Sequence, residues 1–474
     1  MECKLLTEEQ VERIHEASLT ILERTGVSVP HTEMLGRFAD AGANVDHDAQ
    51  RVRIPADLVG RSLETAGKAF TLFGRDMSRR AEFGVGRRNY NSIGGEAFWV
   101  DEVGGPRRPA TLDDVVTASR IGDALEHINL VGSMADPHEL PISCRCVEVA
   151  ATMVKNTVKP IHFWYHDRAS ARFLNELMIA VRGDEQTASE YPLWYPFLEP
   201  ISPLRFPFDG IDLLYETSRL NLAVPIGPMA QMGLSAPMSI AGTMALENAE
   251  ILAGVCITQL IRPGMPVCYG GICHAFDMRT TQLIFSGPEQ AMFGVGMTQL
   301  GKHYGLPVYI NVGLTDSKRP DAQAGLEIAA TLGMGAAAGA DIFGHMGISG
   351  VDQATSLDIL VLQEEIISYV ERTMAPVDMS DEALGLDLID EVGPGGTFID
   401  TMHTVERMRS ELWAPKLLDR EFYQAWLAGG GLSTEQRCRA RRDELLSRHE
   451  PEPPDPSVVN AINEVVKYAR KELV

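Results

Sequence analysis

Two short runs of the sequence concentrate aromatic and histidine side chains. They are His162–His166 (HFWYH) and Trp194–Phe197 (WYPF), although aromatic residues make up only 7% of the chain. The face of an aromatic ring attracts a cation within about 6 Å, and each desolvated contact contributes ~0.5–2 kcal/mol. A group of such rings is expected to bind a quaternary ammonium ion, whereas packing in the core is the alternative for any single ring.

Polar side chains that could act beside these rings follow several other apolar runs. Glu199 precedes a rigid Pro-Ile-Ser-Pro turn, and Asp316 is followed by Lys318, with which it could simply pair. Cys268, Cys273 and His274 could suggest zinc, which needs three or four converging ligands. Two of them are adjacent in sequence, however, and neighbouring residues on a strand point to opposite faces. No bound metal is therefore expected. The remaining polar candidates are Gln231 and His345.

The elements that would position these residues begin at about residue 89. From there, short apolar runs alternate with helical patterns, which predicts a parallel sheet. Eight strand–helix units over roughly 285 residues have the size of a (β/α)8 TIM-type barrel, and a doubly wound open sheet is the alternative. In a barrel the carboxyl ends of the strands carry the active site, so the candidates above would meet there. The expected strands are Asn91–Gly95, Ile128–Gly132, Pro160–Tyr165, Leu193–Glu199, Val224–Met229, Val267–Gly271, Val308–Val312 and Asp341–His345.

The rest of the chain flanks this barrel, which is expected to span residues 89–374. Residues 1–88 are predicted to form an N-terminal helical cap, whose first helix starts after Thr7. Residues 375–474 are predicted to form a C-terminal helical extension, with a stiff Pro-rich linker at 450–456. The linker leads to an amphipathic helix at 457–472, which would pack on the barrel or on a partner subunit. A homo-oligomer is therefore expected.

Composition narrows the class of protein. The 42 basic and 65 acidic residues give a net charge of 42 − 65 = −23, which disfavours nucleic acid and anionic membranes as partners. No apolar run approaches the roughly 20 residues that cross a bilayer. The charged N-terminus has no signal-peptide pattern, and seven scattered cysteines fit a reducing compartment. A cytoplasmic protein is expected.

Several motifs, in order along the chain, resemble the trimethylamine methyltransferase family in its branch without pyrrolysine. The resemblance runs from the N-terminal helix to about residue 425. The family pattern often has Asn where Glu199 stands. The motifs are GGPRRP within Asp101–Pro109, EPISPL at Glu199–Leu204, APMSIAG at Ala236–Gly242, AEILA at Ala249–Ala253, QLIRPG at Gln259–Gly264, DMRT at Asp277–Thr280, SGPE at Ser286–Glu289, GLTDSK at Gly313–Lys318, DAQAG at Asp321–Gly325, and GPGG at Gly393–Gly396 with His403-Thr404.

The resemblance implies a (β/α)8 barrel that moves a methyl group from a methylamine-type substrate to the Co(I) of a corrinoid (cobalamin) carried by a partner protein. Only the twenty standard residue types occur. A quaternary amine such as glycine betaine or a related betaine is therefore favoured over trimethylamine. A quaternary nitrogen already carries its charge, so the amine leaves neutral and needs no general acid.

On this hypothesis the rings bind the cation, and the polar candidates anchor or attract it. Two other functions stay open. One is a metal-dependent barrel hydrolase that uses His274, His345 and Asp316. The other is a non-catalytic protein that binds a betaine or the corrinoid protein. The expected catalytic residues are Asp316, Glu199 and His345, and the expected substrate-binding residues are Trp164, Tyr165, Tyr195, Phe98, His274 and Gln231.

Overall fold

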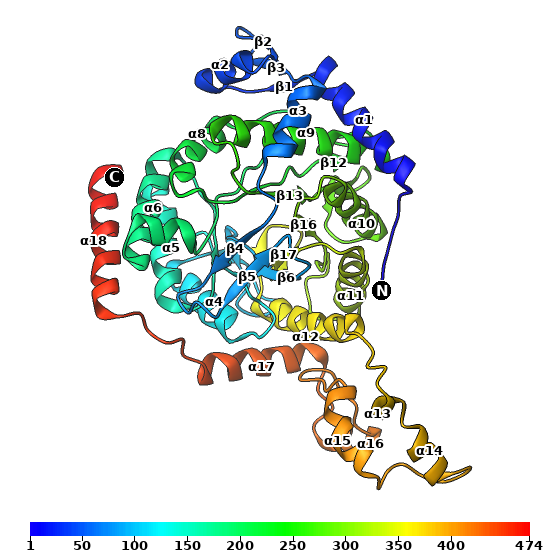
Figure 1. The fold of residues 1–474 in the computed structure, drawn as a ribbon. Helices are drawn as coiled ribbons and strands as arrows, with labels where there is room; N and C mark the ends of the chain where they lie inside the picture. The colour runs from blue at the N-terminus through cyan, green and yellow to red at the C-terminus, as the bar shows by residue number, and fades with distance from the viewer.

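In the computed structural model, which describes residues 1–474, eight extended segments form the wall of a closed barrel (Figure 1). The strands run parallel, and β17 pairs with β6, which closes the ring. The predicted (β/α)8 barrel is confirmed, because an open sheet would leave these two strands as unpaired edges. Seven of the segments are strands: β6 (Asn89–Ser92), β9 (Val131–Gly132), β10 (Ile161–His162), β11 (Val224–Ile226), β13 (Val267–Gly271), β16 (Val308–Asn311) and β17 (Ile342–Met346).

The fourth segment of the wall is extended but forms no regular strand. The amide of Ile161 donates to the carbonyl of Leu193 at 3.1 Å, and the amide of Leu198 donates to the carbonyl of Pro225 at 2.9 Å. Pro196 lies between these contacts and has no N–H to donate. The prediction of a regular strand at Leu193–Glu199 is therefore wrong, although the segment takes the predicted place in the barrel.

Helices surround the wall, and four of the eight start at a residue whose side chain caps them. A capping box joins Thr111 and Asp114 at α4, Asp167 caps α6, and Ser239 caps α9. The helices are α4 (Leu112–Ala124), α5 (Ile142–Asn156), α6 (Arg168–Arg182), α8 (Phe208–Thr217), α9 (Ile240–Ile261), α10 (Pro288–His303), α11 (Ala322–Ala338) and α12 (Leu357–Met374).

Helix α9 corrects one expectation from the sequence. It has 22 residues and a window of mean hydropathy 1.4, so by length and composition alone it could cross a membrane. The expectation that no apolar run is long enough is therefore wrong. In the protein 83% of that window is buried, because α1 (Glu8–Arg24) and α3 (Ala56–Thr65) pack over α9.

The N-terminal residues also close the end of the barrel at which the strands begin. After α2 (Thr32–Asp40) and the small sheet of β1 (Val27–Ser28), β2 (Asn44–Asp46) and β3 (Arg51–Arg53), the chain forms the hairpin of β4 (Phe70–Phe73) and β5 (Arg80–Phe83). Leu72 and Phe83 of this hairpin are buried in one cluster with Tyr195, Phe197 and Tyr309 of the barrel interior. The hairpin thus fills the end opposite the expected active-site face.

The C-terminal residues divide into an exposed part and a packed part. Helices α13 (Asp381–Leu384), α14 (Leu386–Val392), α15 (Met402–Glu411) and α16 (Tyr423–Ala428) project from the barrel at the lower right of Figure 1. Within residues 375–432, Leu417 is the only buried residue. Helix α17 (Thr434–Arg448) then packs on α12 and α4, and α18 (Pro456–Leu473) packs on α5 and α6 of its own barrel.

Candidate active site

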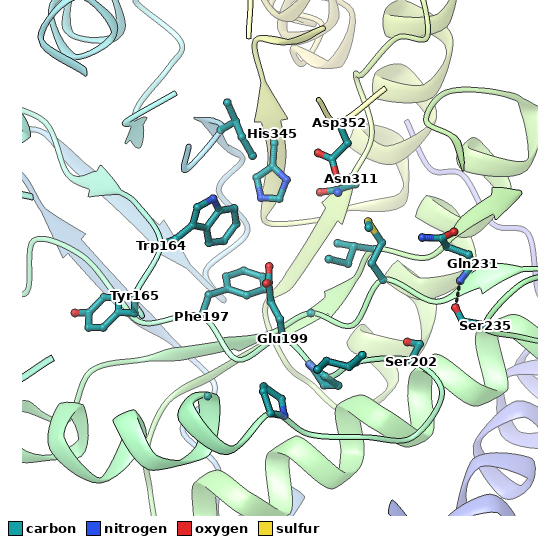
Figure 2. A pocket seen from close by; sticks show the side chains of 18 of the residues that line it. Trp164, Tyr165, Phe197, Glu199, Ser202, Gln231, Ser235, Asn311, His345 and Asp352 are labelled. Atoms are coloured by element: carbon teal, nitrogen blue, oxygen red, sulfur yellow. Dashed lines mark hydrogen bonds between the residues drawn. The ribbon is translucent and has the colours of Figure 1, made fainter. Parts of the chain in front are cut away.

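A cavity of about 910 Å³ opens at the carboxyl ends of the barrel strands, where a TIM barrel carries its chemistry (Figure 2). Residues from at least six of the eight segments converge on it. The side chains discussed below lie on or after these segments: β6 (Glu96), β10 (Trp164, Tyr165), the fourth segment (Phe197, Glu199), β11 (Gln231), β16 (Asn311) and β17 (His345, Asp352).

Two rings form one side of the cavity, which we call the aromatic wall: Trp164 and Phe197. Their centroids lie 6.0 Å apart and the rings are perpendicular. The indole N–H of Trp164 donates to the carbonyl of Gly95 at 3.0 Å, which fixes the ring. A Cβ on Gly94 would approach the indole to 3.1 Å, so the backbone packs closely behind it. The aromatic wall is therefore rigid and uncharged.

Three carboxyl groups also line the cavity, and we call them the acidic wall: Glu96, Glu199 and Asp352. Figure 2 shows the Glu199 carboxylate pointing into the cavity. This side chain is exposed to solvent and lines the cavity. The protein around it raises the pKa of Glu199 to about 7, and the charge of Asp352 adds to the shift. Burial, followed by repulsion from Asp352, also raises the pKa of Glu96 to about 9, so this carboxyl group is protonated at neutral pH.

Buried carboxylates on α9 hold the loops that carry these residues. Glu250 accepts a hydrogen bond from the Ser202 hydroxyl at 2.7 Å, which fixes the turn after Glu199. Glu247 accepts from the backbone amides of Ala230 at 3.0 Å and Cys273 at 2.8 Å. These hydrogen bonds to α9 fix the loops at the carboxyl end of the barrel.

Two polar atoms in the cavity have no partner within the protein. They are Oδ1 of Asn311 and Nε2 of His345, whose side chains are 2% and 5% exposed. Burial, assisted by the nearby His162 and His274, lowers the pKa of His345 well below its usual value, so this imidazole is neutral. Buried polar atoms are nearly always paired, so these two are available to a bound molecule.

The structure brings five of the nine candidate residues to the cavity. One of the five, Tyr165, turns its hydroxyl away from the cavity, where it accepts a hydrogen bond from the indole of Trp194 at 2.8 Å (Figure 2). The other four residues reach the cavity as the sequence predicted: Trp164, Glu199, Gln231 and His345.

Tyr195 is not at the cavity, although it stands two residues before Phe197. It is 2% exposed, and its ring meets Phe70 and Phe83 of the β4–β5 hairpin at 6.2 Å each. Barrel interiors are filled in layers, and Tyr195 occupies the layer beneath the mouth. Residues two apart on an extended segment point to the same side, so the sequence could not show which of Tyr195 and Phe197 reaches the mouth.

Three other candidates also lie outside the cavity. Phe98 is 39% exposed, because β7 (Phe98–Trp99) leaves the barrel to pair with β19 (Ala354–Thr355). His274 is enclosed and stacks on Phe285 at 4.8 Å. Asp316 accepts hydrogen bonds from the amides of Phe285 at 2.9 Å and Ser286 at 3.3 Å, so it staples that loop.

Sequence reasoning missed Glu96, Asp352 and Asn311 as site residues. Glu96 and Asn311 follow or end strands, so the strand-end rule could have included them. Asp352 lies between β18 (Ile348–Ser349) and β19, and no local motif marks it. No group of three or more His, Cys, Asp or Glu side chains is placed to hold a metal ion, so the hydrolase alternative lacks its ligand set.

Comparison with known proteins gives a consistent result. Residues 1–473 match the model of a family described as trimethylamine methyltransferase (MTTB). The chain is 31% identical over 471 residues to the glycine betaine methyltransferase of Desulfitobacterium hafniense strain Y51, covering 99% of this chain and 98% of that protein. It is 28% identical to the trimethylamine methyltransferase MttB of D. hafniense strain DSM 10664 / DCB-2, covering 98% and 94%. The crystal structure of the Methanosarcina barkeri monomethylamine methyltransferase covers 100% of this chain and 96% of its own at a TM-score of 0.50 and 13% identity, which shows a shared fold.

Proposed function

Because the chain belongs to the trimethylamine methyltransferase family, we propose that it transfers a methyl group from a quaternary amine, of the class of glycine betaine and related betaines, to the Co(I) corrinoid of a partner protein. The observation that supports the proposal is the cavity at the mouth of the barrel, which is lined by both the aromatic wall and the acidic wall. Rings and carboxylates together fit a permanent cation.

The two walls divide the work of binding the onium ion. The face of Trp164 contacts the N-methyl groups, and the edge-on ring of Phe197 completes the corner. The carboxylate of Glu199 enters the same space and attracts the positive charge. Neutral His345, whose ring lies 5.7 Å from Trp164, limits how far the ion can move.

The reaction does not require the protein to donate or accept a proton. The C–N bond breaks, its electron pair stays on nitrogen, and the amine leaves uncharged while the methyl group passes to the reduced corrinoid as acceptor. The protein must hold one methyl group in line with the acceptor at about 3–3.5 Å and exclude bulk water. The rigid aromatic wall suits the first task, and the position of the cavity at the open end of the barrel lets a partner protein approach.

A direct assay tests this function. The purified protein is mixed with Co(I) cobalamin and single quaternary amines, and methylcobalamin is followed by its absorbance. We expect methyl transfer from at least one quaternary amine and none from a protein-free control. Absence of transfer from every quaternary amine, also with the cognate corrinoid protein as acceptor, would leave a non-catalytic binder as the better account.

We also propose that the enzyme works in the cytoplasm as a homo-oligomer. The support for an assembly is the surface of residues 375–432, where many large apolar side chains are exposed, among them Ile399 at 80% and Phe422 at 91%. Apolar surface of this extent usually marks a contact with another chain. Size-exclusion chromatography with light scattering measures the assembly, and a monomer at micromolar concentration would contradict it.

A further inference from the structure

The cavity carries negative charge that no positive side chain balances. Glu199 and Asp352 face it from within and Asp209 lies at its rim, whereas Glu96, whose pKa is raised to about 9, is protonated at neutral pH. None of the 23 residues that line it is lysine or arginine. Of the two lining histidines, His345 is held neutral by burial, and His166 donates its Nδ1–H to the carbonyl of Ile142 at 2.9 Å.

Two arginines that do not line the cavity are paired with carboxylates. Arg145 donates to Asp136 at 2.7 Å, and Arg168 donates to Asp212 at 3.2 Å. The N-terminus of α8 meets the cavity, but its first turn contains Asp209, which already places a negative charge at that helix end. An anionic group in the cavity would therefore find neither an arginine fork nor a free helix end.

We propose that the substrate is a quaternary ammonium ion whose remaining arm carries no carboxylate, so that the whole molecule is a cation. This inference rests on the proposed methyl transfer from a quaternary amine, and it places the substrate among the net-cationic quaternary amines instead of the betaines. A betaine would bring its carboxylate within the same cavity as the acidic wall, and like charges repel there more strongly than in water. A molecule with a neutral arm keeps the attraction and avoids the repulsion.

The unpaired polar atoms indicate what the neutral arm carries. Oδ1 of Asn311 accepts hydrogen bonds, and Nε2 of a neutral imidazole accepts or donates one according to its tautomer. The two side chains come from neighbouring strands, because Asn311 pairs with Gly344, the residue before His345, and Figure 2 shows both at the cavity. A hydroxyl group on the arm can donate to Asn311 or bond with His345. The geometry thus points to an ammonium alcohol, with a simple tetraalkylammonium ion as the smaller member of the class.

Choline and glycine betaine test the inference, because they share the trimethylammonium group and differ in a CH₂OH or a carboxylate arm. Isothermal titration of the full-length protein at pH 7.5 should give a Kd for choline at least tenfold below that for glycine betaine. The uncharged isostere 3,3-dimethylbutan-1-ol should bind more weakly than choline. Equal or tighter binding of glycine betaine would overturn the inference, and so would equal binding of the uncharged isostere.

Variants of the acidic wall show whether these carboxylates set the preference. Glu199→Gln should reduce the ratio of the two Kd values by about threefold or more, and Asp352→Asn provides a second, independent variant. Glu64→Gln removes the same charge from an exposed position on α3 and should leave the ratio unchanged. An unchanged ratio in both acidic-wall variants, with native thermal melting, would contradict the assignment.

The methylcobalamin assay separates this inference from the proposed function. Faster transfer from choline or tetramethylammonium than from glycine betaine supports both. Faster transfer from glycine betaine supports the function and overturns the inference. Preferential binding of choline with no methyl transfer from any amine supports the inference about the cavity and overturns the function.

Discussion

The two walls of the cavity bind the same ion by different physics. The aromatic wall of Trp164 and Phe197 is packed, hydrogen-bonded and without charge, so its attraction for a cation does not depend on pH. The acidic wall of Glu96, Glu199 and Asp352 is open to water in the cavity, and its charge depends on protonation. The aromatic wall therefore binds any onium ion, whereas the acidic wall selects among such ions by their net charge. Each wall can be changed by mutation without changing the other.

Loss of the main ring should have the largest effect. Trp164→Ala removes the cation–π contact of about 2 kcal/mol and loosens the alignment of the methyl group, so kcat/KM for methyl transfer should fall about 100-fold. Steady-state methylcobalamin formation measures this. Phe98→Ala is the matched control, because Phe98 lies outside the cavity and its loss should change kcat/KM less than twofold. Equal losses in both variants would remove the distinction between the aromatic wall and other exposed rings.

Removal of one carboxylate should have the next largest effect. Glu199→Gln keeps the shape of the side chain and removes a charge that attracts the bound cation and the charge-dispersed transition state alike. A loss of about 1.4 kcal/mol raises KM roughly tenfold, while kcat should change less than threefold. A fall in kcat with KM unchanged would mean that Glu199 acts on the reaction step and not on binding.

The pH dependence of binding should be smaller and should come from the acidic wall. The substrate has a fixed charge, so only the protein titrates. Because the pKa of Glu199 is about 7, its carboxylate charges as pH rises from 6 to 8, and the Kd for a quaternary ammonium ion should fall about three- to tenfold over this interval. His345 stays neutral throughout. Glu199→Gln should flatten this profile, and Trp164→Ala should weaken binding equally at every pH.

The sequence predicts the barrel better than it predicts the site. Strand and helix patterns with caps such as Thr111 and Ser239 are local, and the number of units then determines the closed ring. For the fourth segment, the sequence predicted the position in the barrel but not the irregular hydrogen bonding, which arises because Pro196 has no N–H to donate. Strand ends also identified Trp164, Glu199 and His345 as residues of the mouth.

The remaining residues depend on relationships that no local pattern records. Tyr195 and Phe197 share one segment, yet the depth of the β4–β5 hairpin places Tyr195 a layer below the mouth. Asp316 has the form of a site carboxylate but binds the amides of Phe285 and Ser286. Asp352 joins the acidic wall only because the β18–β19 segment folds over the barrel. These are tertiary contacts, and they decide which candidates meet.

Tyr165 lines the cavity but is part of neither wall, and the variant Tyr165→Phe should have the smallest effect on catalysis. Its hydroxyl accepts the indole N–H of Trp194 and points away from the cavity, so Tyr165→Phe leaves the binding surface intact and kcat/KM should change less than twofold. The buried indole N–H loses its partner, which should destabilise the fold by about 1–3 kcal/mol and lower the melting temperature. Thermal melting and the methylcobalamin assay on the same sample give both values. A tenfold loss of kcat/KM without a change in melting would place the Tyr165 hydroxyl at the substrate and extend the aromatic wall to a third ring.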